Sequence, residues 1–338
     1  MKSMPLGPLM IDIAGFSLTD LDRERLSHPQ VGGLILFARN YQDREQLTAL
    51  CAEVHALRNP RLLIAIDHEG GRVQRCREGF TRIPPMRKLG ELWESDPETA
   101  KVSAKALGFV LAAELRACGV DLSFTPVLDL DWGRSGVIGN RAFHFDPQVV
   151  TVLAGALIEG LSEAGMKACG KHFPGHGWVE ADSHIAIPVD EREFSAIETD
   201  MIPFRQLALD AVMPAHVIYA KCDEKSSGFS VYWHDVLRNE IKFSGVVFSD
   251  DLSMEGASVA GDIVARATAA WTSGCDVLLV CNAPDAVGDV LVRWQPALDP
   301  VRSQRLSGLL PHEPALTWQA LLDHPLYVRG LTAAQQLL

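Results

Sequence analysis

The chain has 338 residues, of which 47% are hydrophobic and 22% are charged, and its formal net charge at pH 7 is -12. A chain of this size and composition can bury a large core, and α/β barrels of this length commonly form one domain. The acidic balance disfavours nucleic-acid and anionic-membrane partners, because both require a concentrated basic face that this sequence lacks.

The seven cysteines are odd in number and include no Cys-x-x-Cys pair. This pattern argues against a disulfide framework and against a structural zinc site, and it favours a reducing compartment. The early apolar run passes through Asp12, so it lacks the uninterrupted segment of a signal peptide, and no apolar stretch approaches the length of a membrane span. We expect a cytoplasmic monomer.

Short apolar runs recur along the chain, and each is followed by a longer segment of helical character. The expected strands are 9–13, 33–37, 62–66, 122–125, 166–171, 211–215, 246–249 and 277–280. The expected helices are 45–57, 98–118, 147–164, the region 191–209, 233–240 and 262–272. Apolar strands that alternate with helices predict a parallel sheet covered on both faces, and eight repeats predict a (β/α)8 TIM-type barrel.

A doubly wound open sheet is the alternative architecture. Such a sheet normally carries a glycine-rich dinucleotide or phosphate-binding turn after an early strand, and neither GxGxxG nor GxxxxGK[ST] occurs here. The segment from about residue 283 onward has helical stretches and prolines but no further strand pattern. We therefore expect one α/β barrel domain over 1–338, with this segment packed around the barrel.

Polar side chains follow nearly every expected strand at its C-terminal end. They are Asp12, Arg39, Asn40, the stretch 67–72, the stretch 126–131, Lys171, His172, His216, Asp250, Asp251 and Asn282. In a parallel barrel the C-terminal ends of all strands form one face, and active sites are built there. The pattern predicts a site at that face.

The densest of these clusters lies between residues 171 and 184. Lys171, His172, His176, Asp182 and His184 fall within fourteen residues, and an intervening proline and two glycines prevent a helix from running through them. Any one of these histidines could simply satisfy backbone groups in a turn. Five titratable groups on one loop favour chemistry.

Two carboxylate positions stand out beside this loop. Asp67 ends an apolar strand and precedes a glycine pair that lets a ligand approach the backbone, although Arg72 or Arg75 could be its structural ion-pair partner. Asp250 and Asp251 follow another strand, and N-capping of the next helix could explain one of them but hardly both.

We expect neither a metal ion nor another cofactor. His172 and His176 have the spacing of a helical zinc pair, but the Phe-Pro-Gly between them destroys the helical face. Barrel metallohydrolases typically carry His-x-His on the first strand and an aspartate after the last. Here the first strand offers only Asp12, and Asn282 follows the last.

Six runs in the sequence carry a resemblance to a known family. They are VGGLILFARNY (31–41), AIDHEGGRVQRCREGFTRIP (65–84), SFTPVLDLD (123–131), GKHFPGHG with ADSH (170–177 and 181–184), DAVMPAHVIY (210–219) and GVVFSDDLSMEGA (245–257). The chain resembles the family 3 glycoside hydrolases, and among them the bacterial cytoplasmic β-N-acetylglucosaminidases of peptidoglycan recycling. The resemblance spans residues 6 to 282 and fades after that point.

The resemblance implies a role for each matching residue. Asp250 would be the nucleophile, and His184 would be the general acid/base, held by Asp182 as a dyad. The residues implied to bind the sugar are Asp67, Arg75, Arg141, Lys171 and His172. Similar proteins often have a glutamate where Asn140 stands, which puts contacts through that position in doubt.

The chemistry of the residues agrees with these implied roles. Retaining hydrolysis needs a carboxylate on one side of the anomeric carbon and a proton donor on the other. A histidine has an ordinary pKa of about 6.5, and a paired carboxylate such as Asp182 favours its protonated form. Because successive strand residues point to opposite faces, only one of Asp250 and Asp251 can point toward the barrel mouth, and the family pattern selects Asp250.

The resemblance thus predicts a metal-independent retaining exo-β-N-acetylglucosaminidase that releases terminal N-acetylglucosamine from muropeptide fragments, with this small carbohydrate as its partner. One alternative is a phosphorylase that uses the same two residues and delivers the sugar to phosphate. The other is a sugar-binding protein without catalytic activity, against which the presence of both Asp250 and His184 argues.

Overall fold

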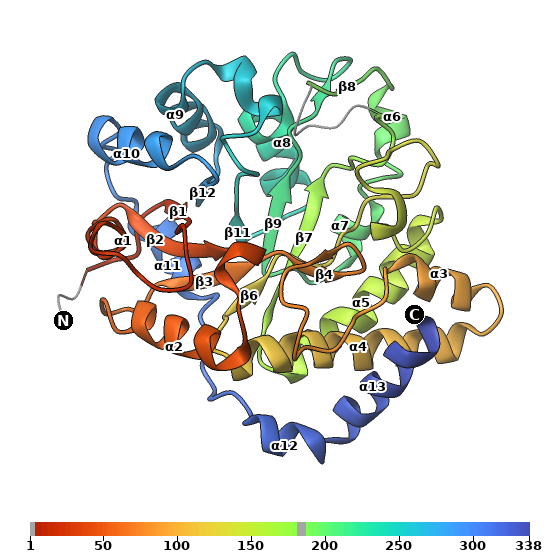
Figure 1. Ribbon diagram of the computed structural model, residues 1–338. Helices are drawn as coiled ribbons and strands as arrows, with labels where there is room; N and C mark the ends of the chain where they lie inside the picture. Colours follow the sequence, from red (N-terminus) through yellow and green to blue (C-terminus); the bar gives the residue numbers. More distant parts are fainter. Residues whose placement is uncertain (1–3, 181–186) are drawn as a thin grey trace.

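The computed structural model describes residues 4–180 and 187–338. Its centre is one curled sheet of eight parallel strands surrounded by helices (Figure 1). The strands are β1 (Leu9–Ile11), β2 (Val31–Leu36), β3 (Leu63–Ile66), β6 (Leu122–Ser123), β7 (Lys167–Phe173), β9 (Ala211–Pro214), β11 (Val246–Val247) and β12 (Leu278–Val280). Each of the eight expected runs overlaps one of these strands, so the strand prediction is confirmed, although β2 begins two residues earlier and β7 ends two residues later than expected.

Along the sheet the strands follow the order β11-β9-β7-β6-β3-β2-β1-β12. The two end strands meet at an isolated parallel bridge between Phe248 and Val277, and the Ser249 amide donates to the Val277 carbonyl at 2.7 Å. This single bridge joins the two end strands over fewer residue pairs than the ladders that join the other neighbouring strands. The architecture is therefore an α/β fold with a curled eight-stranded parallel sheet, as the alternation of apolar runs and helices predicts.

Two small sheets lie outside the central one. Strands β4 (His68–Gly70) and β5 (Val73–Gln74) form an antiparallel pair directly after β3, and β8 (Val189–Asp190) pairs in parallel with β10 (Ile218–Tyr219). The turn between β4 and β5 requires glycine. Gly70 and Gly71 have φ values of 112° and 54°, which side chains rarely adopt.

Helices follow most of the central strands. They are α1 (Asp20–Leu26), α2 (Arg44–His55), α3 (Arg87–Trp93), α4 (Pro97–Ala117), α5 (Pro147–Glu163), α6 (Phe194–Ile197), α7 (Ile202–Gln206), α8 (Val231–Asp235), α9 (Ile263–Ser273), α10 (Pro284–Arg293), α11 (Pro300–Ser307), α12 (Trp318–Leu322) and α13 (Pro325–Leu337). None of the described helices is both long and apolar enough to cross a membrane.

Two helix predictions need correction. The single helical region expected over 191–209 is divided into α6 and α7, and Pro203 lies in the first turn of α7. Proline has no amide hydrogen and fits a first turn, but it would break a continuous helix. The helix expected over 233–240 begins earlier as α8 and ends in a π-helical turn over Val236–Glu240.

Helix α4 is packed between α5 and α13, and glycines allow the close approach. A Cβ on Gly108 of α4 would lie 2.2 Å from the Leu157 carbonyl oxygen of α5, and a Cβ on Gly330 of α13 would lie 2.6 Å from that of Ala106. Figure 1 shows α12 and α13 along the outside of α4. The segment after residue 283 contains the helices α10 to α13, and α12 and α13 pack on α4.

A buried carboxylate connects α4, α13 and the chain after β5. Glu114 on α4 accepts hydrogen bonds from the Thr81 amide at 2.9 Å and from the Tyr327 hydroxyl at 2.7 Å. Burial raises the pKa of Glu114 above its usual range, and these donors oppose that shift. The C-terminal helix thereby stabilises the loop that carries several pocket residues.

We expect Tyr327→Phe to lower the free energy of unfolding by about 1–2 kcal/mol, because it removes a donor from a buried carboxyl group. Denaturant unfolding of the full chain measures this change. The matched control is Tyr232→Phe, whose hydroxyl makes no hydrogen bond to the described residues and whose side chain is partly exposed. Equal stability of Tyr327→Phe and wild type would mean that the hydrogen bond contributes nothing.

Candidate active site

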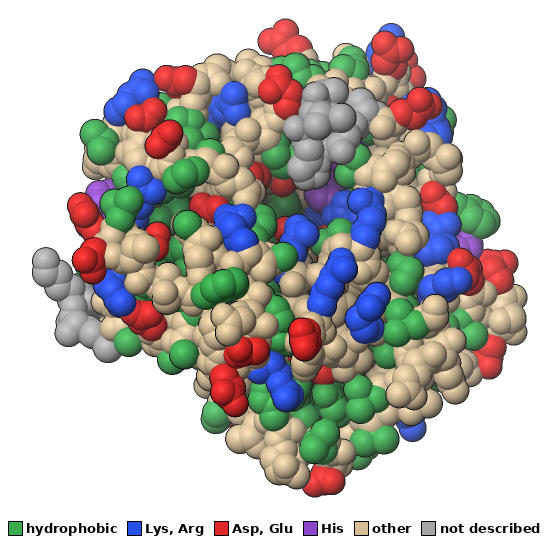
Figure 2. Space-filling view, in the orientation of Figure 1, with side chains coloured by type: hydrophobic (Ala, Val, Ile, Leu, Met, Phe, Trp, Pro, Cys, Tyr) green, Lys and Arg blue, Asp and Glu red, His purple; other side chains and the backbone are tan. Residues whose placement is uncertain are grey.

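A cavity of about 370 Å³ opens at the C-terminal ends of the central strands. Figure 2 shows the hollow in the middle of this face, with basic and acidic side chains around it. Its polar lining consists of Asp67, Glu69, Arg72, Arg75, Arg141, Lys171, His172, His176, Asp250, Asp251 and Asn282. Of the polar residues expected at the strand ends, those in this lining meet around the cavity, whereas Asp12, Arg39, Asn40 and His216 do not line it.

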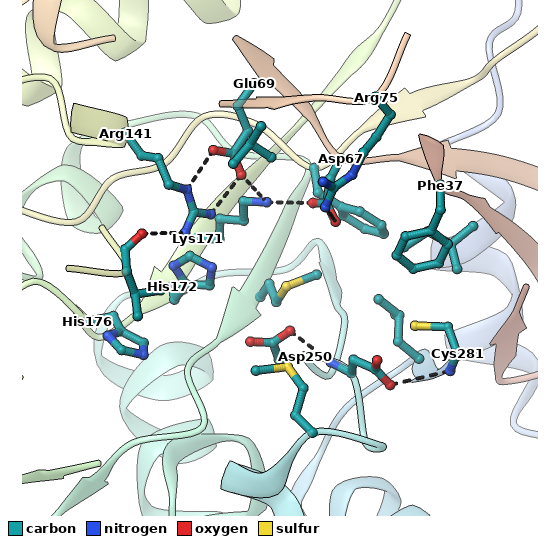
Figure 3. A pocket seen from close by; sticks show the side chains of 18 of the residues that line it. Phe37, Asp67, Glu69, Arg75, Arg141, Lys171, His172, His176, Asp250 and Cys281 are labelled. Atoms are coloured by element: carbon teal, nitrogen blue, oxygen red, sulfur yellow. Dashed lines mark hydrogen bonds and ion pairs between the residues drawn. The ribbon is translucent and has the colours of Figure 1, made fainter. Parts of the chain in front are cut away.

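Lys171 lies at the centre of a buried ion cluster (Figure 3). Its Nζ is 2.7 Å from Asp67 Oδ1 and 2.7 Å from Glu69 Oε1. Arg141 donates two parallel hydrogen bonds to the Glu69 carboxylate, each 2.8 Å long. A bidentate pair of this kind fixes both side chains in a single geometry.

Each charged group of this cluster stabilises the charged form of its neighbours. Burial alone would raise the pKa of Glu69, but Arg141 and Lys171 outweigh it and hold that pKa well below its usual range. Burial alone would lower the pKa of Lys171, but Asp67 and Glu69 raise it. Glu69 and Lys171 are therefore charged at neutral pH, and the cluster offers both donors and acceptors to the hydroxyl groups of a ligand.

Of the two arginines considered as partners of Asp67, Arg75 is the one within reach. Arg75 Nη2 is 3.6 Å from Asp67 Oδ2. Arg72 instead donates from Nη2 to the backbone carbonyls of Gly136 and Val137. From the sequence, either arginine could be the ion-pair partner of Asp67. In the structure Arg72 lies in the turn between β4 and β5, whereas Arg75 follows β5, so the two side chains reach different partners.

Asp129 holds the two histidines that follow β7. Its Oδ2 is 2.7 Å from His172 Nδ1, and its Oδ1 accepts the His176 amide at 2.6 Å. Burial would raise the pKa of Asp129, but the His172 ring and the amide donor lower it below 3.8. Because Asp129 occupies Nδ1, the Nε2 of His172 is the ring nitrogen available to a ligand.

His176 lies beside His172, and the ring centroids are 5.9 Å apart. Burial and the neighbouring His172 ring lower the pKa of His176 to about 4, so it is neutral at physiological pH. A neutral ring in this position can donate or accept a single hydrogen bond without adding charge to the cavity.

Asp250 and Asp251 follow β11 and have different surroundings. Figure 3 shows Asp250 across the cavity from Lys171 and Asp67. Asp251 donates its backbone amide to Asp250 Oδ1 at 2.8 Å. The carboxylate of Asp251 accepts from the Ser253 amide at 2.9 Å and from the Cys281 amide at 3.3 Å, and burial raises its pKa. Asp251 is therefore anchored to the loop and to the residue after β12.

The structure brings six predicted site residues together around the cavity, namely Asp67, Arg75, Arg141, Lys171, His172 and Asp250. Asp182 and His184 lie outside the described residues. Asn140, next to Arg141, is exposed and does not line the cavity. Within residues 4–180 and 187–338, no group of three or more histidines, cysteines and acidic residues is arranged to hold a metal ion.

Sequence reasoning did not assign roles to Glu69 and Asp129. In the sequence Glu69 belongs to the polar stretch 67–72 and Asp129 to the polar stretch 126–131, each at the end of an expected strand. Their burial is the decisive feature, since Glu69 is 2% and Asp129 is 1% exposed. Their position at the end of a strand predicts that both residues lie at the polar face. The sequence does not show which side chains they pair with.

The glycosyl hydrolase family 3 N terminal domain matches residues 9–299. The chain belongs to glycoside hydrolase family 3. It is 60% identical to a protein named Beta-hexosaminidase from Aromatoleum aromaticum, over 96% of this chain and 92% of that one. The family resemblance inferred from the six sequence runs is confirmed, and the chain is a glycoside hydrolase.

Solved structures of this family agree with the fold over the whole chain. NagZ from Neisseria gonorrhoeae in complex with N-trifluoroacetyl-D-glucosamine has a TM-score of 0.93 and 47% sequence identity to this chain. The same protein in complex with zinc ion has a TM-score of 0.92 and 46% identity. Each alignment covers 100% of this chain and 99% of the other.

We expect Asp129→Asn to lower the free energy of unfolding by about 3 kcal/mol at neutral pH, because it leaves buried donors without their charged acceptor. The folded-state pKa of Asp129 is depressed, so its contribution is present above the unfolded value near 3.8 and is lost as the pH falls through the folded value. Unfolding measured from pH 7 to pH 3 should show the two proteins converging at the acid end.

The control for this variant is Asp131→Asn in the same loop. Asp131 is partly exposed and pairs with Arg87, so its replacement should cost much less. A loss for Asp129→Asn that is no larger than that for Asp131→Asn, or that does not change with pH, would contradict the assigned role.

Proposed function

We propose that this glycoside hydrolase is a retaining exo-β-N-acetylglucosaminidase. Its substrates would be peptidoglycan fragments, the anhydro-muropeptides, in the cytoplasm, and no metal ion would take part. The observation that carries the proposal is the cavity in which Asp250 faces the charged cluster of Lys171, Asp67 and Glu69. The Beta-hexosaminidase name of the relative and the N-trifluoroacetyl-D-glucosamine complex of the Neisseria protein support the choice of sugar.

In this mechanism Asp250 attacks the anomeric carbon and forms a covalent glycosyl-enzyme. The Asp251 amide, which donates to Asp250 Oδ1, orients the attacking carboxylate. His184 would give its proton to the leaving oxygen and then take one from the water that releases the sugar, while Asp182 orients and charges the imidazole. Both residues lie outside the described part of the chain, so their roles rest on the family resemblance.

The remaining site residues would bind the terminal sugar. Lys171 and Asp67 present a donor and an acceptor held 2.7 Å apart, a spacing that suits neighbouring hydroxyl groups. Arg141, fixed by Glu69, and His172, fixed by Asp129, would add donors from the adjacent wall. Arg75, loosely paired with Asp67, would complete the set. Interactions with a preorganised site of this kind lower the activation barrier without a reorganisation cost.

We also propose that the bridge between Phe248 and Val277 closes the sheet into a (β/α)8 barrel and that the whole chain is one catalytic domain acting as a monomer. Closure would place the ends of β11 and β12 side by side. The contact of Asp251 with the Cys281 amide depends on that arrangement. Size-exclusion chromatography with light scattering tests the monomer directly.

We expect a 5-fluoro glycosyl fluoride of N-acetylglucosamine to label the protein on Asp250 and Asp250→Asn to abolish labelling and turnover. The reason is that only the carboxylate can form the glycosyl ester. Peptide mapping of the labelled protein and turnover of an aryl N-acetylglucosaminide, with EDTA present throughout, give the two measurements. Loss of activity in EDTA that zinc restores would overturn the metal-independent mechanism.

Arg141→Ala is the matched control for this experiment, because a binding residue should reduce kcat/KM without preventing the label. A label on Asp251 would exchange the roles of the two aspartates. No label together with an oxazoline product would assign the nucleophile to the acetamido group of the substrate.

We expect His184→Ala to slow hydrolysis of glycosides with poor leaving groups by about 10²–10⁴-fold and to affect activated aryl glycosides far less. An activated group departs with little proton assistance. Asp182→Ala should act in the same direction but more weakly, since it only orients and charges the histidine. Rates measured on a series of aryl glycosides of increasing phenol pKa separate the cases, and equal losses across the series would remove His184 as the acid.

A further inference from the structure

Arg72 lines the cavity but has no part in the mechanism described above. It lies in the turn between β4 and β5, and its side chain is exposed at the edge of the cavity. Figure 2 shows basic side chains gathered beside the hollow, although the chain as a whole carries a net charge of -12. Solubility alone does not explain why an acidic protein places a cation at the edge of this cavity.

The charge of Arg72 has no acidic partner among the described residues. The other cations of the cavity are paired with carboxylates: Lys171 with Asp67 and Glu69, Arg141 with Glu69, and Arg75 loosely with Asp67. Arg72 Nη2 donates to two neutral carbonyls, at 3.2 Å for Gly136 and at shorter range for Val137. Its Nε and Nη1 make no hydrogen bond to the described residues.

Both carbonyl contacts are made by the same nitrogen, Nη2, and they anchor that end of the guanidinium group. The backbone that precedes Arg72 is constrained as well, because Gly71 has a φ of 54° and a Cβ there would lie 2.9 Å from Pro85. Nε and Nη1 keep N–H groups that donate to no described residue, and each can donate a charge-assisted hydrogen bond to a carboxylate oxygen.

The location of Arg72 indicates which part of a substrate it meets. Lys171 and Glu69 are deeply buried at the inner end of the cavity, and Arg72 is exposed at its rim. An exo-acting enzyme binds the terminal sugar at the closed end, so the leaving group extends toward the rim.

We propose that Arg72 is an anion subsite for the leaving group and that the preferred substrates carry a carboxylate there. The inference rests on the proposed function and adds the chemistry of the aglycone to it. The alternative is that Arg72 only anchors the segment around Gly136 and Val137 and reads no substrate charge.

A pair of matched substrates distinguishes these roles. The N-acetyl-β-glucosaminides of 3-(4-hydroxyphenyl)propanoate and of its amide differ in charge, while two methylene groups insulate the phenol and keep the leaving groups equivalent. At low ionic strength we expect wild type to show a kcat/KM about two- to fivefold higher for the carboxylate, as for an exposed ion pair. Arg72→Ala should remove this preference, so that its kcat/KM values for the carboxylate and the amide become equal.

Arg77→Ala is the matched control. Arg77 is an exposed arginine that follows β5, and its Nη2 contacts only the backbone carbonyl of Arg72, at 3.5 Å, not the Arg72 side chain. Its replacement changes the net charge equally, and it does not line the cavity. This variant should keep the preference for the carboxylate, which would show that the effect is local. The preference of wild type should also decline as salt is raised, because ions screen exposed charges.

Three results would overturn the subsite. They are a wild type that hydrolyses both substrates equally, an Arg72→Ala that loses the same factor on both, or an Arg77→Ala that loses the preference as fully as Arg72→Ala. The second result would assign Arg72 to anchoring alone. A wild type that hydrolyses neither substrate would remove the proposed function itself, and the subsite with it.

Discussion

The site depends on one buried ion cluster in which Lys171 lies between Asp67 and Glu69. Each of these charges would be costly to bury alone, and removing one partner of a buried pair typically costs about 3–5 kcal/mol because the other charge remains uncompensated. Lys171 comes from β7 and the two carboxylates follow β3, so the cluster also ties two strand ends together across β6. The geometry of the cavity floor follows from this electrostatic requirement.

Carboxylates in this molecule fall into two groups with different physical roles. Asp129 and Asp251 are engaged by backbone amides and neighbouring side chains, and each fixes a residue that faces the cavity. Asp67 and Asp250 face the cavity themselves. Orienting groups of this kind hold the reactive side chains within the narrow range of geometry that catalysis needs.

The C-terminal helices are connected to the same site although they lie beyond the residues matched by the family domain. Glu114 accepts hydrogen bonds from Tyr327 of α13 and from Thr81, which follows β5. These contacts attach the loop after β3 to α4 and α13 on the outside of the sheet. Arg44 stacks over Trp318 of α12 at 4.3 Å from the ring centroid. The loop that carries Asp67, Glu69 and Arg72 is thus supported from outside the sheet, which keeps a glycine-containing turn in one conformation.

The eight strands, their parallel arrangement and the polar face at their C-terminal ends could be predicted without the structure, because apolar runs and the residues that end them are local properties of the chain. Its six characteristic runs also identified the family. Three contacts could be seen only in the folded chain: Arg75 and not Arg72 approaches Asp67, Asp129 holds His172, and the Asp251 carboxylate accepts from the Ser253 and Cys281 amides. Contacts of the site join residues far apart in the chain, 104 positions for Lys171 and Asp67 and 43 for His172 and Asp129. Pairing over such separations depends on how strands align in the sheet, and no local pattern of residues encodes that alignment.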